Sequence, residues 1–391
     1  MITVARALDM VKSHVTKLSP ALMPLEKAEG LVIAADIIAN LDMPAFPQSN
    51  MDGYAFAFDE NITTYVLVGE MAAGNNEQFN LKKGQAVRIF TGAAVPEGAD
   101  TVLIQEKSKV ENNILHILDN DLQKGNHIRQ IGTEIRKGIT AINEGTILKP
   151  GSIGFLAGIG ISEVLVYPKP KVTIIVTGNE LQQPGTPLSY GKVYESNSYT
   201  LKSTLGQLQI HDIAIIQVRD QLSDLTAALN KAIASSDIVL MTGGVSVGDY
   251  DFTLQSFEQS GVHTIFHKIK QKPGKPLLFG KKENTIVFGL PGNPASVLTC
   301  FYEYVLPAIG NLMGQSFSLK QLQVTLIHDY KKPMGLTHFL KAFYDGEKVS
   351  LQLGQESYKL SSYALANCLA VLPEDCTEVK AGIEIDIHLL P

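Results

Sequence analysis

Residues 237–261 read DIVLMTGGVSVGDYDFTLQSFEQSG, and this stretch decides the fold class. Its first five residues form a short apolar run that predicts a buried β-strand. A glycine-rich turn follows, and residues 251–261 then show the spacing of an amphipathic helix. A strand, a glycine-rich turn and a helix in succession are the repeating unit of α/β proteins.

The same alternation extends on both sides, over residues 169–316, beginning just after Pro168 and Pro170. It predicts a parallel sheet covered by helices on both faces. Asn293 and Pro294 have the residue types expected at the N-cap and first position of the last helix. The other predicted caps are Ser196 or Asn197 for residues 196–208 and Ser223 for residues 222–235. The predicted strands are residues 171–178, 211–218, 237–241, 263–269, 276–280 and 285–290.

The flanking regions have a different composition. Residues 21–168 contain short alternating or β-branched runs separated by glycine and proline, which predicts mostly antiparallel β-structure with one helix near residues 152–159. Residues 318–391 again show short β runs and predict a small C-terminal β-barrel or sandwich. Apolar residues at helical spacing between Val4 and Leu18 predict an amphipathic N-terminal helix with Thr3 as its N-cap.

Composition limits the function classes. The chain has 391 residues, 45% of them hydrophobic, and a net charge of −6, which argues against a general nucleic-acid binder. No run reaches about 18 apolar residues, so we expect no membrane span. The three cysteines lack zinc-site spacing, and their odd number suits a reducing compartment, so we expect a cytoplasmic protein.

Chemically useful residues follow nearly every predicted strand of the α/β region. They are the groups Thr177–Glu180, Arg219–Asp220, Gly243–Asp251, Lys270–Pro276 and Pro291–Pro294. Ligands of open α/β sheets bind at the carboxyl ends of the strands, where these loops meet. Carboxylates and lysines on one rim suit a phosphate ligand with a divalent cation.

Each loop alone also has a purely structural explanation. The TGGVSVG turn lacks the Lys-Ser/Thr ending of a Walker A loop, although its N–H groups could bind an anion. Asp251 could simply cap a helix, and the lysine-rich residues 270–276 could be a solvated turn. The histidines show no zinc-protease pair, and no Gly-x-Ser-x-Gly motif is present. Residues 44–56 and 90–106 each contain turn signals that would not reveal a function by themselves.

Six motifs nevertheless occur together in one order. They are NMDGYA (50–55), FTGAAVPEGADTVL (90–103), VTGNEL (176–181), LMTGGVSVGDYDF (240–252), KQKPGKPLLFG (270–280) and GLPGNPAS (289–296). In this order and with these separations they closely resemble the MoeA and gephyrin E-domain family, the molybdopterin molybdenumtransferases. The resemblance covers nearly the whole chain.

The resemblance implies an elongated multidomain α/β plus β subunit. Its parts would be a three-layer α/β (MogA-like) domain of residues 1–19 and 169–316, a β-rich linker module of residues 20–38 and 139–168, a second β-rich module of residues 39–138, and a C-terminal β-barrel of residues 317–391. Family members are homodimers, and the second β-rich module faces the α/β domain of the partner subunit.

The resemblance also implies a reaction. Molybdate is inserted into adenylylated molybdopterin with release of AMP, and Mg²⁺ is the expected cofactor. Expected partners are the two substrates, a second copy of the chain and, transiently, the adenylyltransferase and molybdoenzyme clients, with no nucleic acid and no membrane.

Matching the motifs position by position gives each residue an implied role. The implied catalytic residues are Asp52, Glu180, Asp220, Asp251, Lys268 and Lys272. Three of these, Glu180, Asp220 and Asp251, would also place the metal and the pyrophosphate, and the two lysines would contact phosphate. The implied substrate-binding residues are Thr91, Glu134, Gly243, Gly244, Ser246 and Asn293. The implied molybdate pocket consists of Lys275, Pro276, Ser296, Lys341 and Ser357.

Three positions depart from the common family pattern. Asn179 and Glu134 stand where aspartate is common, and Lys341 stands where arginine is usual. A lysine does not grip an oxyanion with a two-pronged fork. Two other functions are open: a pyrophosphatase or adenylyltransferase built on the same α/β domain, and a scaffold that acts through the dimer interface, as the gephyrin E domain does. The two β-region motifs argue against the first. Against the second, we expect this chain to have neither the extra N-terminal domain nor the long linker of gephyrin.

Overall fold

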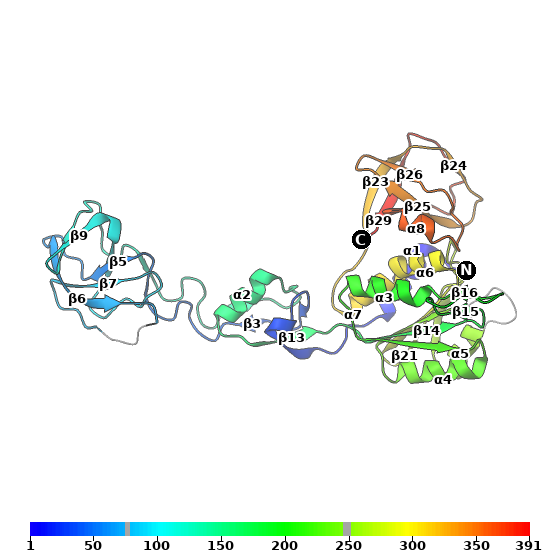
Figure 1. The fold of residues 1–391 in the computed structure, drawn as a ribbon, viewed down its shortest axis with the longest axis horizontal. Helices are drawn as coiled ribbons and strands as arrows, with labels where there is room; N and C mark the ends of the chain where they lie inside the picture. Colours follow the sequence, from blue (N-terminus) through cyan, green and yellow to red (C-terminus); the bar gives the residue numbers. More distant parts are fainter. Residues whose placement is uncertain (75–78, 245–251) are drawn as a thin grey trace. The chain divides into compact units, whose positions relative to one another are not determined.

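The computed structural model describes residues 1–74, 79–244 and 252–391. The chain divides into two compact units (Figure 1). One comprises Met1–Ala21 with Tyr167–Pro391, and the other comprises Leu22–Val166. The first unit contains the α/β domain and the C-terminal domain, and the second contains a six-stranded sheet with smaller sheets and short helices.

The α/β domain is built on a six-stranded sheet with the order β17-β14-β18-β22-β21-β19. The first four of these pair in parallel. The predicted parallel sheet is confirmed for these four strands and is wrong for β21, which pairs antiparallel with both β22 and β19. A short loop rather than a helix joins β19 to β21, and parallel neighbours need a longer crossover. The strands are β14 (Val172–Thr177), β17 (Ile213–Val218), β18 (Ile238–Thr242), β19 (His263–His267), β21 (Leu278–Lys282) and β22 (Thr285–Leu290).

Since β19 is antiparallel to β21, it runs in the same direction as β22 and the other parallel strands. The loops after β14, β17, β18, β22 and β19 therefore emerge at one edge of the sheet. We call this edge the carboxyl rim. The predicted convergence of these loops on one rim is confirmed in this sense.

Helices cover both faces of the sheet, as predicted (Figure 1). In that view α4 and α5 lie below the strands, and α3, α6 and α7 lie above them. Leu229 of α4 and Phe257 of α5 pack against Ile175, Met241 and Val287 of the sheet. The helices are α1 (Val4–His14), α3 (Asn197–Gln207), α4 (Leu222–Ile233), α5 (Phe252–Gln259), α6 (Pro294–Cys300) and α7 (Leu306–Leu312), with a π-helical turn at Phe301–Val305.

The helix ends differ from the prediction in detail. Thr3 caps α1 as expected, since its Oγ1 accepts a hydrogen bond from Arg6 N at 3.2 Å, but α1 ends at His14 and excludes Leu18. Ser223 lies inside α4, whose N-cap position is Gln221. Asn293 holds the N-cap position of α6 without a capping side-chain bond, and its Nδ2 donates to Ser357 Oγ instead.

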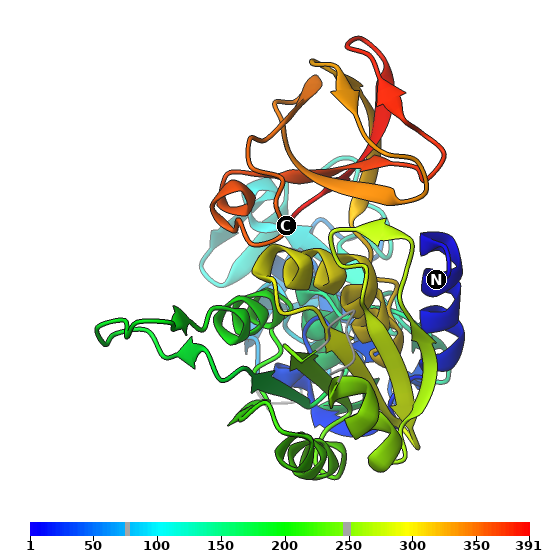
Figure 2. The same ribbon diagram turned by 90° about the vertical axis from the view of Figure 1, so that its right-hand side faces the viewer.

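The C-terminal domain is a closed barrel rather than a sandwich (Figure 2). Strand β25 pairs with both β26 and β27, which closes the order β25-β26-β23-β29-β27 into a ring around Leu326, Leu340 and Ile387. The strands are β23 (Lys320–Leu326), β25 (Thr337–Tyr344), β26 (Lys348–Leu351), β27 (Cys368–Leu372) and β29 (Glu384–Leu389), with α8 (Ser361–Ala364) beside them and β24 (Tyr330–Lys331) paired to β28 (Glu378–Val379).

The second unit is mainly a six-stranded sheet with the order β8-β5-β7-β6-β10-β9. Four of its five pairings are antiparallel, and β6 with β7 is the parallel one. The predicted helix is present as α2 (Pro150–Gly158), but the run at residues 146–149 forms only a single bridge. The strands of this sheet are β5 (Gly53–Phe56), β6 (Thr64–Met71), β7 (Gln85–Ile89), β8 (Thr101–Ile104), β9 (Ser108–Glu111) and β10 (Ile114–Ile117).

Short strand pairs complete the fold. They are β1 (Ala21–Pro24) and β2 (Val32–Ile33) on either side of β13 (Glu163–Tyr167), β3 (Ile37–Ile38) with β12 (Thr140–Ile142), β4 (Gln48–Ser49) with β11 (Ile128–Arg129), and β15 (Leu181–Gln182) with β16 (Val193–Tyr194). Short 3₁₀ turns lie at Leu25–Lys27 and Gln105–Lys107. Within the described residues, no helix is both long and apolar enough to cross a bilayer.

Candidate active site

The first part of the carboxyl rim is acidic and lies where β14 and β17 end. The Asp220 N–H donates to Asn179 Oδ1 at 3.3 Å, and Thr177 Oγ1 donates to Asp220 Oδ1 at 3.4 Å. The exposed Glu180 folds back over Gly178, so that a side chain at position 178 would fall within 2.8 Å of Glu180 Oε1. The fold thus gathers the two predicted acids, Glu180 and Asp220, on neighbouring loops.

The glycine turn after β18 fits against this acidic part. Gly243 has φ +90° and Gly244 has φ +66°, values that side chains rarely adopt. A side chain on Gly243 would clash with the Thr177 carbonyl, and one on Gly244 would lie 3.4 Å from Asp220 Oδ1. The predicted residues Ser246 and Asp251 lie outside the described residues.

Sequence reasoning missed a group of buried polar residues behind this turn. Asn197, at the start of α3, donates from Nδ2 to the Gly292 carbonyl at 2.9 Å, while its Oδ1 is buried without a partner. The Oγ1 of Thr242 is likewise buried and unpartnered. Glu195, only 2% exposed, accepts from Ser198 N at 2.8 Å and Ser198 Oγ at 2.5 Å. Only the fold brings residues 195–198 to the 291–294 turn, so no spacing in the sequence signals them.

The second part of the rim is the lysine loop, residues 268–277, between β19 and β21. Buried Gln271 donates from Nε2 to the Pro273 carbonyl at 3.0 Å and to Cys300 Sγ at 3.6 Å, and it accepts a hydrogen bond from Tyr304 Oη. A side chain at Gly274, where φ is +91°, would overlap the Cys300 sulfur at 2.5 Å. The lysine loop therefore packs against the continuous helical segment that begins with α6 and contains Cys300 and Tyr304.

The barrel holds the same loop from the other side. Strand β20 (Gln271–Lys272) pairs in parallel with β25, with Lys272 opposite His338. Lys270 Nζ lies 3.4 Å from Glu374 Oε2. The buried His338 has an Nδ1 without a partner, and desolvation, reinforced by Lys332 and Lys272, lowers its pKa from 6.5 to about 4. His338 and Lys272 line a cavity of about 340 Å³ together with residues 354–356.

The start of α6 meets the barrel between these two parts. Asn293 Nδ2 donates to Ser357 Oγ at 2.9 Å, and Ala295 N donates to the Ser357 carbonyl at 3.1 Å. Ser296 is buried within the first turn of α6. The structure therefore brings Asn293, Ser296 and Ser357 together, although 64 residues separate the first from the last.

The Lys341 ammonium is not free to bind an anion. It is 2% exposed, and its ammonium donates to the carbonyls of Gly354, Glu356 and Lys359 at 2.7, 3.1 and 3.1 Å. Desolvation lowers the pKa of this lysine. Within the described residues, no such contact engages the ammonium groups of Lys268, Lys272 and Lys275, and these residues are partly or fully exposed.

The two parts of the rim lie some distance apart. Strands β18, β22 and β21 separate β14 from β19, so the strand axes that carry the acids and the lysine loop are about 19 Å apart. The Gly292 turn bridges part of this gap, because a side chain at position 292 would lie 3.7 Å from Gly243 Cα. A ligand that touches both parts has to be extended.

In the second unit, Asp52 and Thr91 contact each other directly. Thr91 donates to Asp52 Oδ1 from its N and its Oγ1, both at 2.8 Å, and these bonds lower the pKa of Asp52. The next residue is Gly53, where any side chain would clash with the Leu103 carbonyl. Glu134 is exposed, and its backbone N–H donates to the Met43 carbonyl at 2.9 Å.

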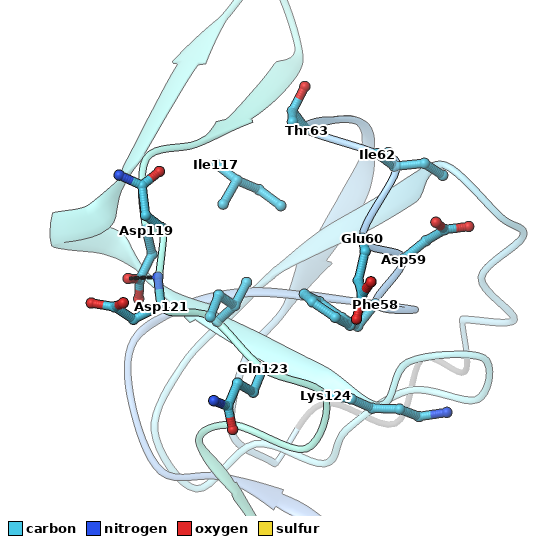
Figure 3. A pocket seen from close by; sticks show the side chains of 12 residues that line it. Phe58, Asp59, Glu60, Ile62, Thr63, Ile117, Asp119, Asp121, Gln123 and Lys124 are labelled. Carbon is cyan, nitrogen blue, oxygen red and sulfur yellow. Dashed lines mark hydrogen bonds between the residues drawn. The ribbon is translucent and has the colours of Figure 1, made fainter.

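The second unit also contains a cavity of about 730 Å³, lined by four carboxylates and Lys124 (Figure 3). Two of the carboxylates already form ion pairs, Asp59 with Lys83 at 2.7 Å and Asp119 with Lys107 at 2.9 Å. The Lys83 pair lowers the pKa of Asp59 to about 2. None of the predicted site residues lines this cavity. Its size alone does not make it a better candidate than the rim.

The donor set of the rim suits a hard divalent cation, although the described residues contain no group of three His, Cys, Asp or Glu side chains placed to hold a metal. Mg²⁺ is usually held by one or two carboxylates together with substrate phosphates and water. Glu180 and Asp220 supply two such carboxylates on adjoining loops, and buried unpartnered oxygens of Asn197 and Thr242 lie behind them.

Three family models match the chain in sequence. They are the MoeA N-terminal region (domain I and II) over residues 2–160, the probable molybdopterin binding domain over residues 173–311, and the MoeA C-terminal region (domain IV) over residues 323–390. Together they cover the six motifs that carry the resemblance.

Individual relatives agree along the whole chain. A molybdopterin molybdenumtransferase of Haemophilus influenzae is 37% identical over 380 residues, which is 94% of each chain. One of a Nostoc species is 34% identical over 95% of this chain and 88% of its own. The crystal structure of a molybdopterin biosynthesis MoeA protein from Pyrococcus horikoshii matches with a TM-score of 0.83 at 29% identity, over 100% of this chain and 99% of that one.

Proposed function

The chain belongs to the molybdopterin molybdenumtransferase family and is a transferase of molybdenum cofactor biosynthesis, and from this premise we propose its substrates and the division of its site. We propose that it inserts molybdate into adenylylated molybdopterin and releases AMP, with Mg²⁺ as cofactor. The observation that carries this proposal is the two-part rim, with acids after β14 and β17 and lysines after β19.

An adenylylated pterin is an extended molecule with a charged pyrophosphate near its middle. Glu180 and Asp220 would hold the magnesium ion, which supplies charge stabilisation at the pyrophosphate oxygens when bound. Lys268 and Lys272 would contact phosphate and offset the negative charge that develops as the phosphoryl bond breaks. Gly243 and Gly244 have φ values of +90° and +66°, and the backbone N–H groups of this glycine turn would bind a phosphate oxygen.

The molybdate site would lie where the lysine loop, the start of α6 and the barrel meet. Lys275 and Pro276 come from the first of these, Asn293 and Ser296 from the second, and Ser357 from the third. Lysine ammonium and serine hydroxyl groups are suitable donors for a tetrahedral oxyanion.

The second unit would complete the site of a partner subunit in a homodimer, through Asp52, Thr91 and Glu134. The Thr91 bonds keep Asp52 ionised, which suits an acid that faces a metal-bound substrate. The adenylyltransferase and molybdoenzyme clients are the transient partners we propose, and the cytoplasm is the proposed compartment.

One assay tests the reaction. Purified protein is given adenylylated molybdopterin, Mg²⁺ and molybdate, and AMP release and active cofactor are measured. No AMP and no cofactor would refute the proposal. AMP release that does not require molybdate would instead indicate a pyrophosphatase, the alternative built on the same α/β domain.

A subunit-mixing experiment tests the shared site. Asp52→Ala and Asp220→Asn subunits are each expected to be inactive, and a mixed dimer should regain part of the activity because one of its two sites is intact. Absence of any rescue would assign both residues to the same half of the dimer.

A further inference from the structure

Lys341 of β25 is surrounded by the loop that follows β26. Its ammonium has three protons, and the carbonyls of Gly354, Glu356 and Lys359 accept them at 2.7, 3.1 and 3.1 Å. The side chain is buried, and its donors are fully used within the protein.

Further hydrogen bonds fix the same loop. Gln355 accepts from Lys341 N at 3.0 Å and donates from Nε2 to the Lys341 carbonyl at 2.8 Å. Ser362 Oγ donates to the Gly354 carbonyl at 2.7 Å and to the Lys359 carbonyl at 3.2 Å. The loop is thus folded around the Lys341 ammonium.

This loop carries Ser357 to the start of α6. Ser357 Oγ accepts from Asn293 and its carbonyl accepts from Ala295 N, so the loop reaches the candidate oxyanion site. Residues 354–356 also form one wall of the cavity that contains Lys272. Any shift of the loop would move Ser357 and this wall together.

We propose that Lys341 is a positioning residue, which affects oxyanion binding only by holding residues 354–359 so that Ser357 lies against the start of α6. The proposal rests on the proposed function, since it concerns the same molybdate site. The family resemblance implies that the residue at position 341 contacts molybdate directly, and the role proposed here takes the place of that contact. To reach molybdate, the ammonium would have to give up its three hydrogen bonds to these carbonyls, and hydrogen bonds made by a charged group are costly to lose.

Replacement of Lys341 by arginine separates the two roles. A guanidinium is planar and has five donors in a fixed fork, which improves a direct oxyanion contact but does not fit a cage of three carbonyls around an ammonium. If Lys341 positions the loop, Lys341→Arg weakens molybdate binding. If Lys341 contacts molybdate, the same change strengthens it or leaves it unchanged.

The main measurement is the calorimetric Kd of molybdate for the full chain, which does not depend on turnover. Lys341→Met and Ser357→Ala are each expected to raise this Kd about tenfold, the effect of one lost polar contact. The double variant should be no weaker than the weaker single variant, because both changes remove the same contact. Additive losses, an unchanged Kd in Lys341→Met, or tighter binding in Lys341→Arg would each overturn the proposal.

Lys332→Met is the matched control. Lys332 is also a buried barrel lysine, 6% exposed, and its ammonium donates to the Leu336 carbonyl at 2.8 Å. Among the described residues, the Asn293 side chain donates to Ser357 and not to the loop of Lys332. We expect it to lower stability without changing the molybdate Kd. Gln355→Ala, which loosens the loop and leaves the ammonium in place, should raise the Kd and provides a second test if Lys341→Met does not fold.

Steady-state kinetics keep this proposal distinct from the proposed reaction. In Lys341→Met the KM for molybdate should rise, and the KM for the adenylylated pterin should stay unchanged. Failure of the wild-type chain to release AMP would refute the reaction, while the calorimetric comparison would still decide the role of Lys341.

Discussion

The acidic part and the lysine part of the carboxyl rim are supported in opposite ways. Glu180 and Asp220 lie on loops at the surface, and Asp220 has one long side-chain hydrogen bond and one backbone bond. The lysine loop is held by buried Gln271, by Tyr304 and Cys300 beneath it, and by strand pairing to the barrel. The acidic part, which we propose to bind the metal, thus depends mainly on its charges, and the lysine part, which we propose to bind the anion, depends on the buried polar contacts around it.

The largest expected effect comes from the acids. Asp220→Asn and Glu180→Gln should keep the fold and reduce Mg²⁺-dependent AMP release by roughly 100-fold or more, because each removes a carboxylate without changing its size. The measurement is kcat at saturating Mg²⁺, with thermal unfolding as the control. Activity within threefold of wild type would remove that acid from the site.

Substitution in the glycine turn beside the acidic part should change the stability of the protein. Gly243→Ala forces a side chain onto a residue with φ +90° and into the Thr177 carbonyl, so we expect a loss of about 2 kcal/mol in the free energy of unfolding. Denaturant titration measures this. Ala at Gly151, within α2 and with open space around its Cβ position, is the matched control and should be neutral or stabilising.

The support of the lysine loop can be weakened without touching a lysine. Tyr304→Phe leaves the buried Gln271 Oε1 without its Tyr304 donor, which should cost about 1 kcal/mol of stability. The KM for the adenylylated pterin should rise, since Lys272 is the next residue. A stability loss with unchanged KM would show that the loop keeps its shape without this contact, and would contradict the proposed division.

The smallest expected effect is a pH dependence of the barrel. The pKa of His338 is about 4 in the folded chain against 6.5 for an ordinary histidine, so the unfolded chain binds the proton first as pH falls. Stability from this group is therefore complete above pH 6.5 and is lost towards pH 4, with about 0.7 kcal/mol lost between pH 7 and pH 6. His338→Gln should remove this part of the pH dependence, and an identical pH profile in the variant would refute it.

Much of the fold was predictable because its signals are local. The alternation over residues 169–316 predicted the helices on both faces, and the Asn293-Pro294 pair predicted where α6 begins. The antiparallel direction of β21 was missed, because a run such as residues 276–280 carries no information about its partner. The start of α4 was predicted wrongly because Ser223 is a favoured N-cap residue type, whereas Gln221, which holds the N-cap position, is not.

The motifs named charged and uncharged candidates for the site, but they did not name the buried contacts that support it. Motifs named Glu180, Asp220 and the lysines, whose residue types reveal their chemistry. The supports of the site, such as Asn197 on Gly292 or Tyr304 on Gln271, are pairs of ordinary residues separated by 95 and 33 positions. Their roles depend on three-dimensional contacts that no local pattern encodes.

One further contact links the lysine loop to the beginning of the chain. Ile2 N donates to the Lys268 carbonyl at 3.3 Å, and Lys270 N donates to the Ile2 carbonyl at 2.8 Å, so that Ile2 and Ile269 form a parallel bridge. During synthesis, residue 2 leaves the ribosome more than 260 residues before its partner. The N-terminal segment has to wait while the whole second unit is made, and the lysine loop reaches its final form only once the two segments meet.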